Sequence, residues 1–188
     1  MAYPRVIPHS DGAGIIDAAG SGVDPARVGR PAWCYGAQSY RAFGTAAELV
    51  VVPGGLAVDL PPGDDHSQER DLAEQAACLG IAGITAHRAI FADGSVDGLS
   101  VLIHGAAGGV GSIATQMAHR DGARVIAVVR AGQRQRALEL GADHVFSDEE
   151  PDLAAAIRNV APDGVQRIAE VDFADHIELD AEVVAVGG

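Results

Sequence analysis

The apolar residues in the second half of the chain alternate between the spacing of strands and the spacing of helices. Short, mostly apolar runs at 101–103 and 124–129 predict two buried strands. Between them, apolar residues recur three and four positions apart from Val110 to Ala118, which predicts a helix that ends at Gly122. Strand, helix and strand follow one another over about 30 residues, which is the length of one βαβ unit.

The same alternation continues towards residue 188. It predicts a helix at 133–140, a short strand at 144–146 and a helix with Pro151 in its first turn. A strand at 166–171 and a last helix from Ala174 to about Val184 complete the pattern. Because strands that alternate with helices form parallel sheets, we predict an α/β fold with a doubly wound parallel sheet from residue 98 onward.

The first 60 residues show instead the short apolar runs and glycine or proline turns of β-structure. Strands are predicted at 14–18, 47–52 and 56–60, which are too few to close a barrel or to cover a sandwich. A polar stretch at 61–70 is the predicted junction, and two short helices follow it, one that Gly80 stops and one at 84–91. We therefore divide the chain into a partial β domain at 1–62, a helical connection at 63–97 and an α/β domain at 98–188.

Charge and cysteine content narrow the class of protein. The formal net charge of −13 argues against nucleic acid or an anionic membrane as a partner, since both require a basic surface. No apolar run approaches the roughly 18 residues of a membrane span. Cys34 and Cys78 are far apart and form no C-x-x-C pair, which favours a reducing, cytoplasmic setting.

The turn between the first strand and the helix of the βαβ unit has the pattern of a dinucleotide-binding loop. It fits G-x-G-x-x-G with alanine at the first glycine, and glycines there let the backbone approach a pyrophosphate and the helix lie close to the strand. An ordinary tight turn is the alternative interpretation. The predicted cofactor-binding residues are Ala106, Gly108, Gly109, Val110 and Gly111.

The residues after the second strand favour NADP(H) over NAD(H). NAD-preferring folds place a carboxylate there for the ribose 2′-hydroxyl, but this chain has Arg130 and no acidic residue between Asp121 and Glu139. An arginine can grip a 2′-phosphate, so Arg130 and Arg134 are predicted to bind the cofactor. The alternative is that these arginines are only solvated residues of a surface helix.

Four segments carry a resemblance to a known family. They read PHSDGAG at 8–14, GTAAE at 44–48, GITA at 83–86 and GAAGGVG at 105–111. In this order they resemble the medium-chain dehydrogenase/reductases, in the zinc-free quinone oxidoreductase branch that includes zeta-crystallin. The resemblance implies a partial GroES-like catalytic domain at 1–62 and the first half of a Rossmann NADP-binding domain at 98–188.

That resemblance also implies an activity and further site residues. Members pass hydride from NADPH to a quinone or an α,β-unsaturated carbonyl, and many form homo-oligomers. Thr85 resembles the family's threonine near the nicotinamide. Tyr40, in an expected polar loop that also holds Trp33, Tyr35 and Arg41, is a candidate substrate contact, although loops commonly hold tyrosines without a catalytic role. No catalytic residue is assigned.

No metal is predicted. Zinc-dependent relatives carry Gly-His-Glu just before the first strand, whereas this chain has Ser10 at the ligand position and His9 one place away. A shift of one residue in an extended segment turns a side chain to the other face. The other histidines form no pair at ligand spacing within one expected element.

Two hypotheses about function remain open. The chain is shorter than the family pattern at both ends, and Phe146-Ser147 stand where members often have Asn-Tyr. It is either an NADPH-dependent reductase or the core of one, or a remnant or accessory chain that binds nucleotide without catalysis. A short-chain reductase is excluded because the chain has no Tyr-x-x-x-Lys pair.

Overall fold

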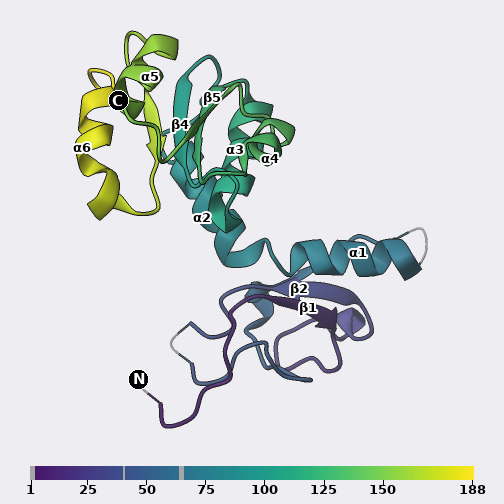
Figure 1. Cartoon of the computed structure of the whole chain (residues 1–188). Coiled ribbons are helices and arrows are strands. Elements are labelled where there is room, and N and C mark those ends of the chain that lie inside the picture. The colour runs from purple at the N-terminus through teal and green to yellow at the C-terminus, as the bar shows by residue number, and fades with distance from the viewer. Residues whose placement is uncertain (1–2, 40, 64–65) are drawn as a thin grey trace. The chain divides into compact units, whose positions relative to one another are not determined.

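The computed structural model describes residues 3–39, 41–63 and 66–188 (Figure 1). The chain divides into two compact units, Met1–Ile81 and Ala82–Gly188. The first unit holds a three-stranded antiparallel sheet and the second a four-stranded parallel sheet. The predicted α/β class is therefore confirmed.

The sheet of the first unit has the strand order β1-β2-β3. Trp33, in the middle strand, pairs with Ala13 on one side and Val58 on the other. The guanidinium of Arg27 lies 2.6 Å from the carboxylate of Asp59 and ties a short 3-10 helix to β3. The elements are β1 (Gly12–Ile15), the 3-10 helix Pro25–Arg27, β2 (Pro31–Cys34), the 3-10 helix Gly54–Leu56, β3 (Ala57–Asp59) and α1 (His66–Ala76).

One strand prediction for this unit is wrong, and one strand was not predicted. Residues 47–52 form no strand, and Leu49 and Val51 are 75% and 88% exposed, because an apolar run becomes a strand only where a partner strand and a face to bury exist. The strand that the sequence did not predict is β2, which contains Trp33. Its first residue is Pro31, a position where a strand tolerates proline, and the Pro31 carbonyl accepts the N–H of Leu60.

The helix α2 (Gly80–Phe91) begins where the sequence predicted a helix to stop. The Asp11 side chain accepts a hydrogen bond of 2.6 Å from the N–H of Ile81, in the first turn of the helix. A Cβ on Gly80 would lie 2.3 Å from the Asp11 carboxylate, so only glycine fits there. Asp11 therefore caps a helix, in agreement with the structural role that the resemblance gives it.

The second unit is built on a parallel sheet in the order β6-β5-β4-β7. The central strand β4 is buried along its whole length and pairs with β5 and β7 on its two sides. Strands and helices alternate along the chain as the sequence predicted. The elements are β4 (Ser100–His104), α3 (Gly109–Asp121), β5 (Arg124–Val129), α4 (Arg134–Glu139), β6 (His144–Ser147), α5 (Leu153–Val160), β7 (Arg167–Ala169) and α6 (Phe173–Val183).

Helices cover both faces of this sheet, so its two cores lie on opposite faces (Figure 1). Successive side chains of a strand point to opposite faces, and Ile103 packs in the core that also holds residues of α2 and α3. Leu102 packs in the other core, with Ile157 of α5 and Val183 of α6. The predicted doubly wound arrangement is confirmed. Truncation of a fully buried side chain such as Ile157 to alanine costs about 2–5 kcal/mol.

None of the helices in the described part of the chain is both long and apolar enough to cross a bilayer.

Candidate functional site

The turn between β4 and α3 is held in one conformation by backbone packing. Gly105 has the left-handed backbone angle φ 59°, which L-residues with a side chain rarely adopt. The N–H of Ala106 donates to the carbonyl of Val128 on β5, at 3.2 Å, and the Thr115 hydroxyl donates to the carbonyl of Ala106. These contacts fix the conformation of the chain that leads into α3. Within the turn, Gly105 is the residue whose backbone angle favours glycine.

Gly111 brings the helix close to the strand that precedes it. A Cβ at this position would lie 2.1 Å from the carbonyl oxygen of Gly105. A Cβ on Gly108 would lie 3.1 Å from the same oxygen, which is closer than most real Cβ contacts. A Cβ on Gly109 would meet nothing within 4 Å. The glycine pattern thus has two steric functions: close packing at Gly111 and an open, exposed surface at Gly109.

The N-terminus of α3 offers unsatisfied backbone donors at that surface. Gly108 is the N-cap residue and supplies no side-chain cap, and the first N–H groups of a helix have no acceptor within the helix. The helix dipole adds a partial positive charge at the same end. Gly108 and Gly109 are exposed and Val110 is half-buried. Such a terminus can bind an anion such as a phosphate group.

Arg130 follows β5 at the same edge of the sheet as the glycine turn. β5 runs parallel to β4, and His104 pairs with Val128, so both strands end at this edge. Arg130 is exposed. The guanidinium of Arg134, unlike that of Arg130, has a hydrogen-bond partner within the part of the chain that the structure describes. It donates to the carbonyl of Val145 and thereby links α4 to β6. The described residues between Asp121 and Glu139 include no carboxylate.

Of the other predicted site residues, one lies on a described helix and one lies outside the described residues. Thr85 is exposed on α2, whose buried residues Ala86 and Ile90 share a core with Ala106. Tyr40 lies outside the described residues.

The segment before β1 does not resemble a metal site. His9 is exposed and has the left-handed angle φ 74°, and Ser10 is half-buried. Among the described residues, neither belongs to a group of three side chains that could ligate one metal ion. These residues do not fit a catalytic zinc held in the manner of zinc-dependent relatives.

The structure brings together a polar cluster that sequence reasoning missed. His104 is fully buried, and its Nε2 lies 2.8 Å from Oδ1 of Asp180 and 3.5 Å from Oε2 of Glu170. The same Glu170 oxygen lies 2.9 Å from Nδ1 of His176, and the two imidazole rings stack with centroids 4.2 Å apart. The sequence search considered histidine pairs within one element, whereas these side chains come from β4, the end of β7 and α6. A histidine at the end of a buried strand was the available signal.

The pKa values of the two carboxyl groups in this cluster are shifted in opposite directions. Burial and the nearby Glu170 charge raise the pKa of Asp180, although its hydrogen bond to His104 opposes that rise. Burial also acts to raise the pKa of Glu170. Hydrogen bonds from the Asp172 N–H and from His176 outweigh it, so the pKa of Glu170 lies below its ordinary value.

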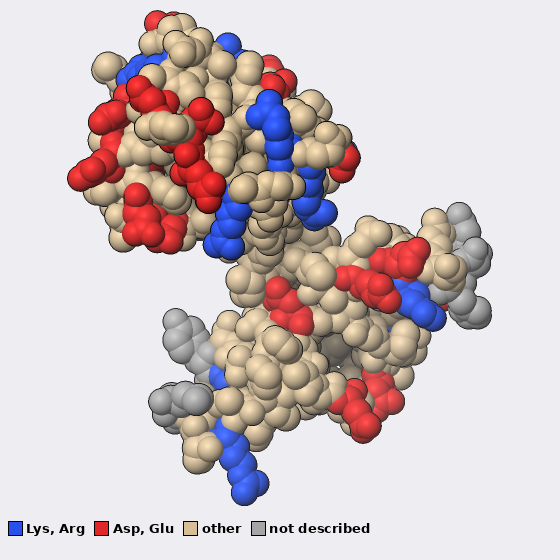
Figure 2. Space-filling view, viewed as in Figure 1, with Lys and Arg blue, Asp and Glu red and all other residues tan. Residues whose placement is uncertain are grey.

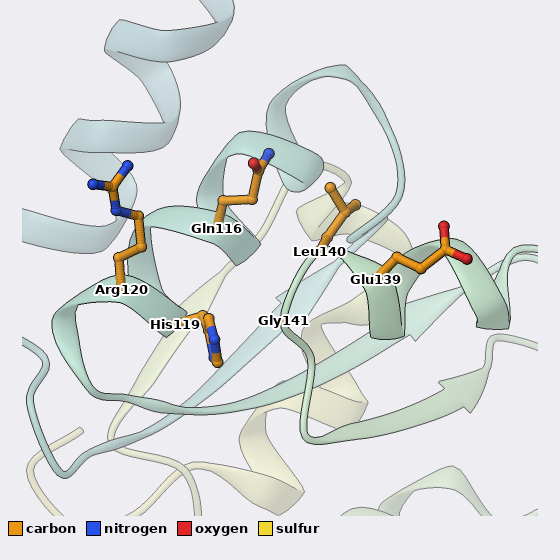
Figure 3. A pocket seen from close by; sticks show the side chains of 6 residues that line it. All are labelled: Gln116, His119, Arg120, Glu139, Leu140 and Gly141. Atoms are coloured by element: carbon orange, nitrogen blue, oxygen red, sulfur yellow. The ribbon is translucent and has the colours of Figure 1, made fainter.

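A separate shallow pocket lies between the C-terminal ends of α3 and α4 (Figure 3). A Cβ on Gly141, whose φ is 102°, would lie 2.5 Å from the ring of His119. This pocket is at the opposite end of α3 from the glycine turn, so it does not extend the anion site. The residues that line it are Gln116, His119, Arg120, Glu139, Leu140 and Gly141.

Comparisons with known proteins agree with this geometry. The family model described as "Zinc-binding dehydrogenase" matches residues 109–188. A quinone oxidoreductase of Rattus norvegicus is 33% identical over 186 residues, which is 96% of this chain and 53% of the relative. A chloroplastic quinone-oxidoreductase homolog of Spinacia oleracea is 36% identical over 155 residues, covering 79% of this chain and 44% of the relative.

Solved structures show the same fold. The quinone oxidoreductase of Pseudomonas syringae pv. Tomato DC3000 superposes with a TM-score of 0.81 at 26% identity, over 98% of this chain and 55% of that one. The Escherichia coli quinone oxidoreductase, solved in complex with NADPH, gives 0.76 at 26% identity, over 93% of this chain and 51% of that one. The chain spans about half the length of the relatives it matches.

Proposed function

We propose that this chain, which belongs to the medium-chain dehydrogenase/reductase superfamily in its quinone oxidoreductase branch, binds NADP(H) for hydride transfer to a quinone or an α,β-unsaturated carbonyl. The observation that carries the proposal is the uncapped N-terminus of α3, whose first turn lies against the end of β4 because only glycine fits at position 111. The 1–62 and 98–188 regions are then a partial GroES-like domain and a nucleotide-binding half, with 63–97 connecting them.

The proposed roles follow the chemistry of each position. The N–H groups of Gly109, Val110 and Gly111 would bind the pyrophosphate. Gly108 is exposed and has no side chain to obstruct the phosphates, and the buried Ala106 would pack under the turn. The nicotinamide supplies the hydride when the cofactor is bound. The protein's own contribution is to bind the cofactor, to orient it and to exclude water.

NADP(H) is proposed over NAD(H) because Arg130 is exposed at the sheet edge where the adenosine ribose lies in this class of fold. A guanidinium can form two parallel hydrogen bonds with a 2′-phosphate. Arg134 is proposed in a secondary role, since its side chain already bonds to Val145. The Escherichia coli and mycobacterial structures similar to this chain were solved with NADPH.

The remaining proposals rest on the family. Thr85 would lie near the nicotinamide and Tyr40 would contact the substrate. Catalysis would proceed without zinc, because Ser10 replaces the ligand histidine and His9 does not join a ligand group among the described residues. A cytoplasmic location fits the free thiols of Cys34 and Cys78, and a homo-oligomer fits the family.

A second candidate is a nucleotide-binding chain without catalytic activity. The observation that favours it is that the proposed cofactor cradle lies wholly within the second unit, whereas the first unit has only a three-stranded sheet among its described residues. Both candidates predict binding of NADPH, and only the first predicts turnover.

The test is a fluorescence titration of the folded chain with NADPH and with NADH, followed by NADPH oxidation assays with 1,4-benzoquinone and with a simple enone. Saturable binding that prefers NADPH supports the cofactor proposal, and oxidation of NADPH that depends on the quinone or enone supports the reductase. Binding without turnover supports the second candidate. Absence of binding by a chain that circular dichroism shows to be folded contradicts both.

A further inference from the structure

The polar cluster beneath α6 has the composition of a metal site. Three elements of the second unit contribute to it: His104 from the end of β4, Glu170 from the residue after β7 and His176 from α6. One candidate ligand atom from each side chain lies within 4.8 Å of the other two. Two imidazoles with one carboxylate form a ligand set that zinc and similar divalent transition metals prefer.

The two distances from the Glu170 oxygen to the imidazole nitrogens lie near the spacing that a metal ion imposes on its ligands. Ligands at 2.0–2.1 Å from a tetrahedral zinc lie about 3.3 Å from one another. Oε2 of Glu170 lies 3.5 Å from Nε2 of His104 and 2.9 Å from Nδ1 of His176. Oδ1 of Asp180, 2.8 Å from the same His104 nitrogen, is placed to act as a fourth ligand.

The carboxylate at the centre of the cluster is held in place before any ion arrives. Oε1 of Glu170 accepts the backbone N–H groups of Val171 and Asp172, which turns Oε2 toward both imidazoles. Partners of this kind orient a ligand and raise the affinity of a metal site. Only 11% of the Glu170 side chain and 28% of the His176 side chain are exposed, so solvent reaches the cluster from the His176 side.

The charge of the surroundings also favours a cation. Two carboxylates approach His104, whereas no arginine is paired with either of them among the described residues. Acidic side chains also gather on the surface of the second unit around α6 (Figure 2). The cluster therefore combines two imidazoles and two carboxyl groups without a neighbouring guanidinium among the described residues.

We propose that His104, Glu170 and His176 form a binding site for one divalent transition-metal ion of zinc-like chemistry, with Asp180 as a fourth ligand. The site lies on the α5–α6 face of the sheet, where Leu102 and Val183 pack. It is distinct from the segment before β1 that holds zinc in zinc-dependent relatives, and it does not depend on nucleotide binding.

Metal binding changes the local structure in a defined way. Each imidazole directs its lone pair in the plane of its ring, so the His104 and His176 rings, now 17° from parallel, tilt apart when both face one ion. Nδ1 of His104 then carries the ring proton without an acceptor among the described residues. Because metal-bound histidines normally donate that proton to a partner, the ion binds reversibly and EDTA removes it.

The experiment uses the EDTA-treated full chain, titrated with ZnCl₂ or with Co²⁺. The expected result is one ion per chain by elemental analysis, a visible d–d absorption band with Co²⁺, and a thermal midpoint that rises with zinc. His176→Ala, at the most exposed ligand, and Glu170→Gln should each weaken binding by roughly 10- to 100-fold. His119→Ala, an exposed histidine outside the cluster, is the matched control and should bind as the parent chain does.

Stoichiometric binding that His176→Ala weakens and His119→Ala leaves unchanged supports the site. The proposal is overturned by a folded parent chain that binds no ion, or by binding that His176→Ala and His119→Ala alter equally. His104 is left intact in these variants, because its burial makes misfolding the simplest result of its replacement. NADPH titration of the same samples separates a failure here from a failure of the cofactor proposal.

Discussion

The carbonyl oxygen of Gly105 lies 2.1 Å from the position that a Cβ on Gly111 would occupy. That is far inside van der Waals contact, and the neighbouring atom is backbone, which cannot rotate away. The first turn of α3 can therefore lie this close to the end of β4 only with glycine at position 111. The proposed phosphate site exists because of this approach.

Gly111→Ala is expected to destabilise the chain by about 1–3 kcal/mol, since α3 must move away from β4. NADPH binding should weaken with it. Urea unfolding monitored by circular dichroism measures the loss of stability. Gly109→Ala is the control, because its Cβ meets nothing and alanine favours a helix by about 1 kcal/mol over glycine. Equal loss in both variants would show that packing at Gly111 is not the cause.

Gly109→Asp separates binding from stability. A carboxylate in the first turn of a helix stabilises it by about 0.3–1 kcal/mol, yet it would occupy and repel the place of a phosphate. NADPH affinity is expected to fall by about tenfold or more, as measured by fluorescence titration, while the urea midpoint stays equal or rises. Undiminished affinity in this variant would place the cofactor elsewhere on the chain.

Arg130→Glu should weaken NADPH binding by about 10- to 100-fold, because hydrogen bonds to a charged group contribute about 1.5–3 kcal/mol each. The binding of NADH, which lacks the 2′-phosphate, should weaken much less. Arg136→Glu makes the same change of charge at an exposed position on α4 and serves as the control. If NADPH and NADH weaken to the same extent, Arg130 does not read the 2′-phosphate.

Asp121 gives a prediction about stability and pH. Its hydrogen bonds with the Ser95 hydroxyl and the Val96 N–H hold its pKa below the ordinary 3.8. A lowered carboxyl pKa contributes stability above the unfolded-state pKa, and that contribution is lost as the pH falls through the folded-state pKa. Asp121→Asn should therefore lower the urea midpoint at pH 7, and its difference from the parent should shrink below pH 3.8. A difference that stays constant as the pH falls well below 3.8 would mean that charge is not involved.

The two cysteines should differ in reactivity. Burial and the charge of Asp11 raise the pKa of the Cys34 thiol, whereas Cys78 is exposed. Because the thiolate is the reactive form, iodoacetamide should modify Cys78 at least about tenfold faster. Peptide mass mapping over time measures both rates, and Cys78→Ser should leave one slow thiol. Similar rates would show that the sheet around Cys34 opens readily.

The second unit could be predicted well from sequence because its signals are local. Each strand from β4 to β7 is a short apolar run or lies beside a helix of clear periodicity, and Gly122 ends α3 with φ 96°, as expected of a helix C-cap. The glycine turn also follows from neighbours in the chain. The local conformation at Gly108 to Gly111, where the phosphate site is proposed, was predictable for the same reason.

The first unit was less predictable because its strands depend on partners. The run at 47–52 has the right residues for a strand but no partner, while β2 begins with proline and becomes a strand because β1 and β3 flank it. The cluster around His104 was not predicted from the sequence, for a related reason. His104 and Asp180 are 76 residues apart, and no spacing rule connects the end of a strand to a helix seven elements further along the chain.

The central position of β4 also sets an order for assembly of the nascent chain. Its contacts with β5 join residues 24 apart, as at Ser100 and Arg124, whereas the contact of Ser100 with Gln166, beside β7, joins residues 66 apart. Closing the shorter loop costs less chain entropy and needs less of the chain to have left the ribosome. The glycine turn between β4 and α3 can therefore form while α6 is still being synthesised, and the histidine cluster is the last part of this unit to close.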